Sequence, residues 1–169
     1  MDKRFFVFYV LIGAILLGVV LPADSLFALF AAMMLAVGCG ALEGLHPLFR
    51  PASFAGAAWA LVLLLGRAGI VPAAPGALAL RIVSALALCL LALAVAALER
   101  ETLGSPMIAW AAIVLIGVGC AGQVLLDLGL FPAAAIAVRA YVEKAGPLGS
   151  IVLLIAVCRA QSAVIRKGE

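Results

Sequence analysis

Long apolar runs alternate along the chain with short connections that hold most of the charged residues and prolines. A helix of about 20 apolar residues spans the roughly 30 Å hydrocarbon core of a bilayer, and these runs approach that length. They predict membrane-spanning helices near residues 5–21, 26–42, 54–71, 77–98, 106–126 and 147–165. The expected fold class is therefore all-α: a polytopic integral membrane helical bundle with six transmembrane helices, forming one membrane domain over residues 1–169.

The first apolar run has two interpretations. It follows a basic start, as the core of a signal peptide does. Its 17 residues are long for that role, however, and the Leu-Pro-Ala sequence at residues 21–23 is a poor cleavage site. We therefore predict an uncleaved first span.

The last third of the chain is less regular. Residues 131–145 are too charged to cross a bilayer, since they contain Arg139, Glu143 and Lys144. They predict a short helix that lies in the membrane interface and ends before Pro147. The run at 147–165 is interrupted by charged and polar residues, so five spans with a slanted or re-entrant last segment is the alternative.

The run at residues 106–127 is expected to be the central helix, with the most protein contacts. Its second half holds four small residues, which let another helix approach closely: Gly117, Gly119, Ala121 and Gly122. Gln123 and Asp127 follow, and such side chains are costly in lipid unless they face protein or water. Arg67 and Arg81 are expected near the same membrane face, so one of them is a candidate ionic partner for Asp127.

Two pairs of small residues are spaced by about one helical turn: Gly40 with Gly44, and Gly117 with Ala121. This spacing is typical of close helix packing in membranes, although it is frequent by chance in a chain rich in glycine and alanine. We predict that both pairs pack against a helix, either of this chain or of a partner.

The connection at residues 43–53, EGLHPLFRPAS, is the most polar one and contains the one histidine of the sequence. Glu43, His46 and Arg50 are candidates for a small site at the membrane surface. A solvated side chain is the simpler interpretation of a single histidine in an interfacial loop.

The segment VGCGA at residues 37–41 resembles VGCAG at residues 118–122, 81 residues later. A duplication with units 1–75 and 80–169 would place three spans in each unit, and an odd number of spans inverts the second copy. Chance similarity is the alternative, because these letters are common here and the third and sixth spans align poorly.

Composition supports the membrane assignment and gives no support to nucleic-acid binding. Of the 169 residues, 68% are hydrophobic and 11% are charged, against about 25% charged in a typical soluble domain. The net charge is +3, without a basic run that could follow a phosphate backbone. With six spans, Lys and Arg number seven on the side of the termini and four on the other. We therefore expect cytoplasmic termini in a bacterial inner (plasma) membrane.

The chain offers little chemistry. One histidine cannot supply two axial haem ligands, and the four cysteines stand singly without metal-binding spacing. No catalytic or phosphate-binding motif is present. We therefore expect no enzyme activity, no cofactor and no bound metal.

The leading functional hypothesis is a non-catalytic subunit, which packs in the lipid bilayer against a larger membrane-protein partner or against copies of itself. The alternative is a small-solute transporter or transporter subunit with a polar path along Arg81, Gln123 and Asp127. A third hypothesis is an enzyme that acts on a lipid through the connection at residues 43–53. The transporter hypothesis predicts a cavity around the polar path, whereas the subunit hypothesis predicts an uncovered surface of small residues.

Overall fold

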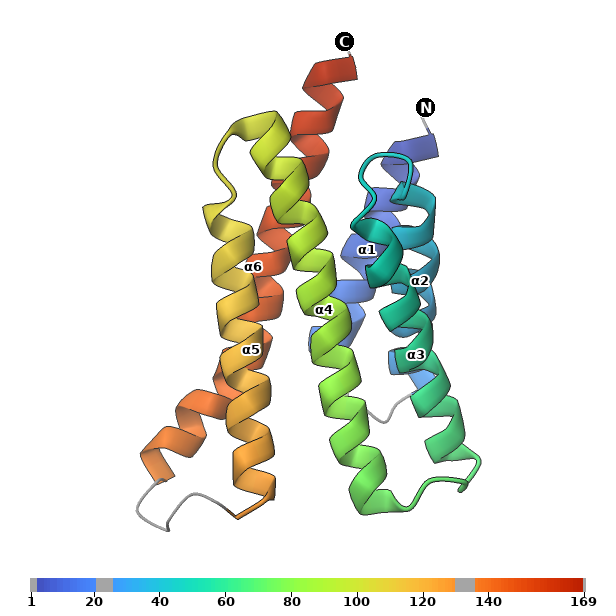
Figure 1. The fold of residues 1–169 in the computed structure, drawn as a ribbon, viewed down its shortest axis with the longest axis vertical. Coiled ribbons are helices and arrows are strands. Elements are labelled where there is room, and N and C mark those ends of the chain that lie inside the picture. Colours follow the sequence, from blue (N-terminus) through green and yellow to red (C-terminus); the bar gives the residue numbers. More distant parts are fainter. Residues whose placement is uncertain (1–2, 21–25, 130–135, 169) are drawn as a thin grey trace.

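The computed structural model describes residues 3–20, 26–129 and 136–168, and nearly all of them are helical (Figure 1). The described ranges contain no β-strand. They form six helices: α1 (Lys3–Val20), α2 (Leu26–Leu42), α3 (Phe49–Arg67), α4 (Ala73–Leu103), α5 (Met107–Asp127) and α6 (Ile136–Gly168). The predicted all-α membrane helical bundle is confirmed.

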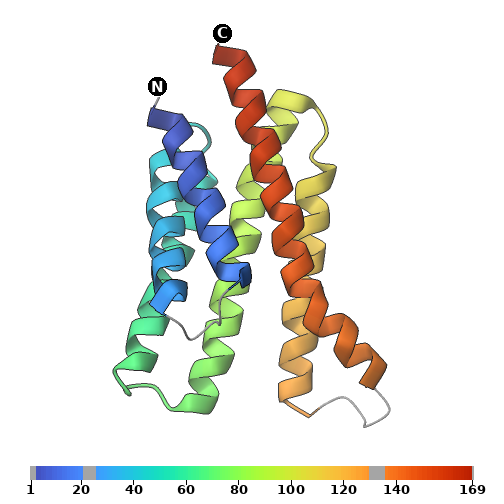
Figure 2. The same cartoon turned by 180° about the vertical axis from the view of Figure 1, so that it is seen from behind.

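Four of the helices, α3 to α6, are long and apolar enough to cross a membrane. Helices α1 and α2 are also apolar but shorter, at 18 and 17 residues. The start of α1 and the end of α6 lie at the same end of the bundle (Figures 1 and 2). The fold is that of a multi-pass membrane protein.

Helices α2 and α5 coincide closely with the predicted spans, whereas α3 both begins and ends four to five residues earlier than predicted and α4 is longer. Helix α3 begins earlier than predicted, at Phe49, because Pro51 lies in its first turn, where a helix does not need the missing N–H. Helix α4 passes its predicted end and stops before Gly104, which has a φ of 74°. The backbone N–H of Gly104 donates to the carbonyl of Glu99 and closes the last turn.

The short interfacial helix predicted near residues 131–145 is not a separate element, because α6 runs continuously from Ile136 to Gly168 through Pro147. Residues 131–135 lie outside the described residues. A proline lacks the N–H that would bond to the carbonyl four residues earlier, and membrane helices tolerate this loss where neighbouring groups compensate. Figure 2 shows the first part of α6 leaning away from the bundle, as expected for a helix bent at a proline.

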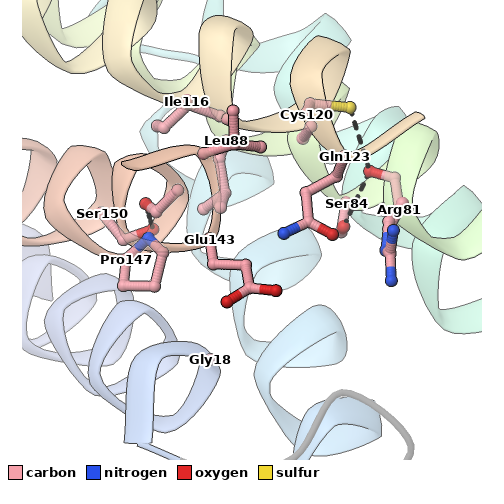
Figure 3. Close-up of a pocket in the computed structure, with 14 residues that line it drawn as sticks. Gly18, Arg81, Ser84, Leu88, Ile116, Cys120, Gln123, Glu143, Pro147 and Ser150 are labelled. Carbon is pink, nitrogen blue, oxygen red and sulfur yellow. Dashed lines mark hydrogen bonds between the residues drawn. The ribbon is translucent and has the colours of Figure 1, made fainter. Parts of the chain in front are cut away.

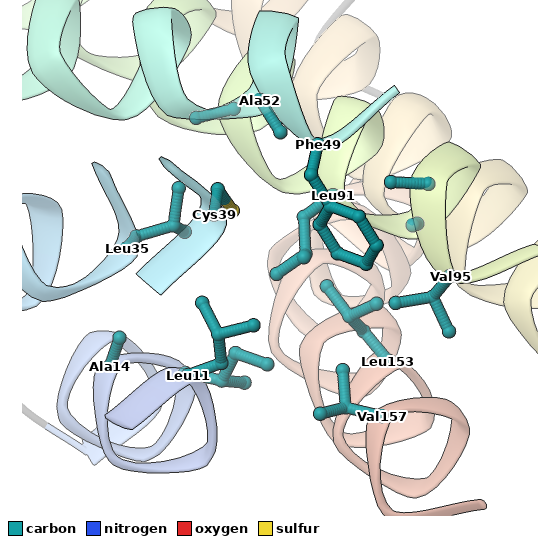
Figure 4. Packing of buried hydrophobic residues seen from close by; sticks show 14 of the residues in the cluster. Leu11, Ala14, Leu35, Cys39, Phe49, Ala52, Leu91, Val95, Leu153 and Val157 are labelled. Atoms are coloured by element: carbon teal, nitrogen blue, oxygen red, sulfur yellow. The ribbon is translucent and has the colours of Figure 1, made fainter. Parts of the chain in front are cut away.

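The expectation that α5 is the central helix is wrong. Helix α6 packs against both α1 and α4, and α5 lies outside, mainly against α4 and α6. Figure 4 shows the core, where each of the other five helices contributes a large, fully buried side chain: Leu11, Leu35, Phe49, Leu91 and Leu153. The fully buried side chains of α5 are those of the small residues Ala109 and Ala112. The apolar stretch of α6 is 44% buried, against 28% for α5 and for α4.

Helices α5 and α6 nevertheless approach each other closely, through glycines. A Cβ atom on Gly119 would lie 2.6 Å from the backbone nitrogen of Gly146. One on Gly149 would lie 2.8 Å from the backbone nitrogen of Ile116. The two backbones are therefore in contact, which requires residues without a side chain.

The four small residues that the sequence predicted to pack helices are not part of this contact between α5 and α6. Gly117 and Ala121 are exposed on α5, and a Cβ on Gly117 would meet no described atom within 4 Å. Gly44 is exposed in the turn after α2, and a Cβ on Gly40 would approach Ser53 Oγ of α3 at 3.3 Å. Of the four, only Gly40 therefore faces another helix of the described chain, and packing through Gly117 and Ala121 would require a partner molecule.

Gly38 and Gly119 occupy equivalent positions in the predicted repeat, but they contact different neighbours. A Cβ on Gly38 would lie 2.7 Å from Leu11 Cδ2 of α1, the preceding helix, whereas Gly119 faces α6, the following helix. The repeat of units 1–75 and 80–169 stays a prediction.

Candidate functional site

Arg81 and Asp127 meet at the end of the bundle that is opposite the chain termini. Because α4 and α5 are antiparallel, the ninth residue of α4 lies near the last residue of α5. Arg81 Nη1 and Asp127 Oδ2 form an ion pair, and both side chains are partly exposed. The expected pairing of Asp127 with an arginine is confirmed. A lone charge at an apolar helix end is costly, and the pairing reduces that cost for both residues.

A cavity of about 400 Å³ lies beside this ion pair, between α4, α5, α6 and the end of α1 (Figure 3). Its polar lining comes from three helices: Arg81 and Ser84 of α4, Cys120 and Gln123 of α5, and Glu143 and Ser150 of α6. Ile116 also lines it and is the tenth of the 21 residues of α5, so the cavity reaches about half-way along that helix. Cavities of this size are typical of small-molecule sites.

Hydrogen bonds to the backbone fix part of this lining. Ser84 Oγ donates to the carbonyl of Arg81 at 3.1 Å, and Cys120 Sγ lies 3.8 Å from the same carbonyl oxygen. Figure 3 shows the side chains of Gln123 and Glu143 pointing into the same open space. The amide of Gln123 has two N–H donors and a carbonyl acceptor, so it can either donate a hydrogen bond to a bound molecule or accept one from it.

Glu143 was not among the predicted site residues, because its segment is typical of a separate surface helix. In the structure Glu143 Oε1 accepts a hydrogen bond from Arg139 Nε at 2.8 Å, one turn earlier in α6. The i, i+4 spacing of the two charges was the signal that could have indicated the pair. Since Asp127 balances Arg81 and Arg139 balances Glu143, the charged lining of the cavity is close to neutral.

A second ionic group, at the other end of α4, was also missed. The side chain of Glu99 is fully buried, and Arg159 Nε of α6 lies 3.9 Å from its Oε1. Within the described part of the chain neither carboxylate oxygen of Glu99 accepts a hydrogen bond. Helix α4 therefore has an ionic partner near each end.

The candidate surface site of Glu43, His46 and Arg50 is divided in the structure. Glu43 Oε1 lies 3.7 Å from Arg50 Nε, in an exposed ion pair. His46 instead turns toward α4, where its Nε2 lies 3.7 Å from Glu101 Oε1. Its Nδ1 accepts a hydrogen bond from the backbone of Leu48 at 3.2 Å. His46 is therefore oriented by a different carboxylate from the one that the sequence suggested.

Among the described residues, no three His, Cys, Asp or Glu side chains gather closely enough to hold a metal ion. The candidate site is a polar cavity with nearly balanced charges, which opens beside the ion pair of Arg81 and Asp127. Comparison with models of protein families, with curated proteins and with solved structures gave no match.

Proposed function

We propose that the protein binds a small polar solute in this cavity and carries it across the membrane, as a transporter or as the solute-binding subunit of one. The main support for this proposal is that polar side chains of three helices line a cavity that reaches half-way along α5. Polar groups inside an apolar bundle are costly, and they are usually retained where they line the path of a solute. This is the arrangement expected from the transporter hypothesis, with Glu143 as an added member.

The charge balance indicates the class of solute. Arg81 and Glu143 already have partners of opposite charge in the protein, so an ion of either sign would have to compete with an existing ion pair. A neutral or zwitterionic molecule meets no such competition, and it can hydrogen-bond to the amide of Gln123.

The ion pair supports a role in access to the cavity. Arg81 lines the cavity, whereas its partner Asp127 lies one turn beyond Gln123 at the end of α5. The pair therefore ties α4 to α5 near the end of the bundle. Loosening it would let the two helix ends move apart, as alternating access requires.

Cys120 provides a direct test, since it lines the cavity. The protein is reconstituted in liposomes with Cys120 as its one cysteine, after replacement of Cys39, Cys89 and Cys158 by alanine. We expect a water-soluble maleimide to label Cys120, and amino acids, sugars and polyols are then screened for protection. Flux of the protecting solute should fall about tenfold in Gln123→Leu, as expected for a lost hydrogen bond of about 1.4 kcal/mol. Asp127→Asn should change the rate of flux but preserve protection.

The matched control is Val118→Leu, a substitution on the exposed side of the same helix, which should leave protection and flux unchanged. Cys120 that reacts only after denaturation would show that water does not enter the cavity. Equal flux in Gln123→Leu and in the wild type would show that the solute does not pass through the cavity beside Gln123. Either result contradicts the proposal.

The accessory-subunit hypothesis keeps one specific observation in its favour. Gly117 and Ala121 lie one turn apart on α5, both are exposed, and a Cβ on Gly117 would meet no described atom within 4 Å. Such a surface allows the close approach of a helix from another molecule. The membrane proposed for either function is a bacterial inner membrane with both termini in the cytoplasm. The start of α1 and the end of α6 lie at one end of the bundle, which supports placing both termini on the same side of the membrane.

We expect Gly117→Leu to remove a stoichiometric partner, or to dissociate a homo-oligomer, when the protein is purified in mild detergent and its mass is measured. The bulky side chain would keep a second helix away from α5. Gly66→Leu is the control, because Gly66 is also an exposed helical glycine with no described atom within 4 Å of its Cβ position. A protein that is monomeric before the substitution, without a co-purifying partner, would contradict the subunit hypothesis.

A further inference from the structure

A groove of about 540 Å³ lies between the end of α4 and the second half of α6, away from the solute cavity. Leu103 is the last residue of α4, and the remaining lining residues belong to α6. The deeper part of the groove is apolar and includes Leu154 and Ile155. Its polar part includes two arginines, Arg159 and Arg166.

The two arginines lie on the same face of α6. They are seven residues apart, which is two helical turns or about 10 Å along the axis. Ser162 lies between them, and Ile155 continues the same row one turn earlier. The groove is therefore amphipathic along its length, with aliphatic side chains at one end and two guanidinium groups toward the other.

The groove also lies at the depth where lipid headgroups occur. Leu103 and Arg166 are the last residues of two candidate membrane spans, at the end of the bundle that holds both chain ends (Figure 2). Leu154 is 12 residues before Arg166, which places it about 18 Å deeper along the helix. The cationic part of the groove thus faces the interface, and the apolar part faces the hydrocarbon.

The ionic interaction with Glu99 orients the side chain of Arg159, which lines the groove. The buried carboxylate faces Arg159 through the Nε atom, and a guanidinium has four further N–H donors on its two terminal nitrogens. With the charge of Glu99 subtracted, the two arginines leave one net positive charge at the groove. That charge complements one phosphodiester group.

We propose that this groove is a binding site for an anionic phospholipid. The phosphate lies between Arg159 and Arg166, where guanidinium groups form charge-assisted hydrogen bonds to its oxygens. One acyl chain lies along Leu154 and Ile155. The site does not depend on the solute cavity, and it would anchor α6 against α4 on the side of the chain termini.

The test is native mass spectrometry of the full chain in mild detergent, titrated with phosphatidylglycerol or phosphatidylcholine of the same acyl composition. We expect phosphatidylglycerol to bind at least fivefold more tightly. Arg166→Gln should lower the affinity for phosphatidylglycerol about fivefold and leave the affinity for phosphatidylcholine unchanged. The double variant Glu99→Gln/Arg159→Gln leaves no unpaired buried charge and keeps the net charge of the groove, but it removes the guanidinium donors of Arg159. It should therefore also bind phosphatidylglycerol more weakly than the wild type does.

Arg50→Gln is the control, because Arg50 is an exposed arginine at the same end of the bundle but outside the groove. An equal loss in this variant would show a general attraction of anionic lipid to that end and would overturn the site. Equal affinity for the two lipids in the wild type would do the same. Displacement of phosphatidylglycerol by millimolar inorganic phosphate would show a free-anion site and would also overturn the lipid proposal.

Discussion

Replacing Arg159 with leucine is expected to destabilise the folded protein by about 3 kcal/mol. The substitution leaves the carboxylate of Glu99 fully buried without a cation, and breaking a buried ion pair from one side typically costs about 3–5 kcal/mol. We choose the lower end of that range because 40% of the Arg159 side chain is exposed, so the pair is not completely desolvated.

The measurement is the free energy of unfolding in mixed micelles with increasing dodecyl sulfate, followed by the fluorescence of Trp59 and Trp110. The matched control is Arg166→Leu, two turns later on the same helix, for which we expect a change of at most about 0.5 kcal/mol. In the double variant Glu99→Leu/Arg159→Leu most of the stability should return, because apolar residues can replace a buried ion pair without loss. Wild-type stability of Arg159→Leu at neutral pH, or no rescue in the double variant, would contradict the assignment of Glu99 as a buried anion held by Arg159.

The second large effect is expected at the contact between α5 and α6. A Cβ at Gly119 would lie 2.6 Å from the backbone nitrogen of Gly146 and 3.0 Å from its Cα, and backbone atoms cannot rotate away. The helices would have to separate, which would also loosen the contact of Gly149 with Ile116. We expect Gly119→Ala to lose about 1–3 kcal/mol, the usual range for overpacking, and Gly119→Leu to lose more or to fail to fold.

Gly117→Ala is the matched control, since it introduces the same methyl group two residues earlier in the same helix. A Cβ there would meet no described atom within 4 Å, so the gain in helix propensity of up to about 1 kcal/mol should dominate. The same unfolding titration measures both variants. The rate of Cys120 labelling should change only in Gly119→Ala, because Gly119 lines the cavity. Similar stabilities for the two alanine variants would mean that α5 and α6 do not cross at Gly119.

The ionic lining of the cavity could be predicted only in part. Arg81 and Asp127 were recognisable because each is a charge near the end of an apolar run, and alternation of the spans places both ends on one side. Glu143 was not recognisable in this way, since it lies in a polar segment that is typical of a surface helix. Its position in the lining follows from the continuation of α6 through Pro147, which local sequence preferences disfavour and tertiary contacts permit.

The sequence by itself determined that the apolar runs form helices long enough to lie in a membrane. In lipid every backbone polar group must bond within its own element, so an apolar run of sufficient length becomes a helix, and α2 and α5 have the expected ends. It did not determine which side of each helix meets which neighbour. In a chain that is apolar nearly all round, hydropathy distinguishes depth but not direction, because lipid and protein interior are equally apolar.

Only the tertiary structure decided which face of each helix contacts which neighbouring helix. Gly117 and Gly119 are equivalent in the sequence, yet two residues rotate the helix by about 200°, so one faces open space and the other contacts α6. The packing of α6 against both α1 and α4 made α5 peripheral. It also buried Glu99 beside Arg159, although its position in the sequence is typical of a charged helix end. These contacts join residues far apart in the chain, and their energies come from shape and charge complementarity that no local pattern contains.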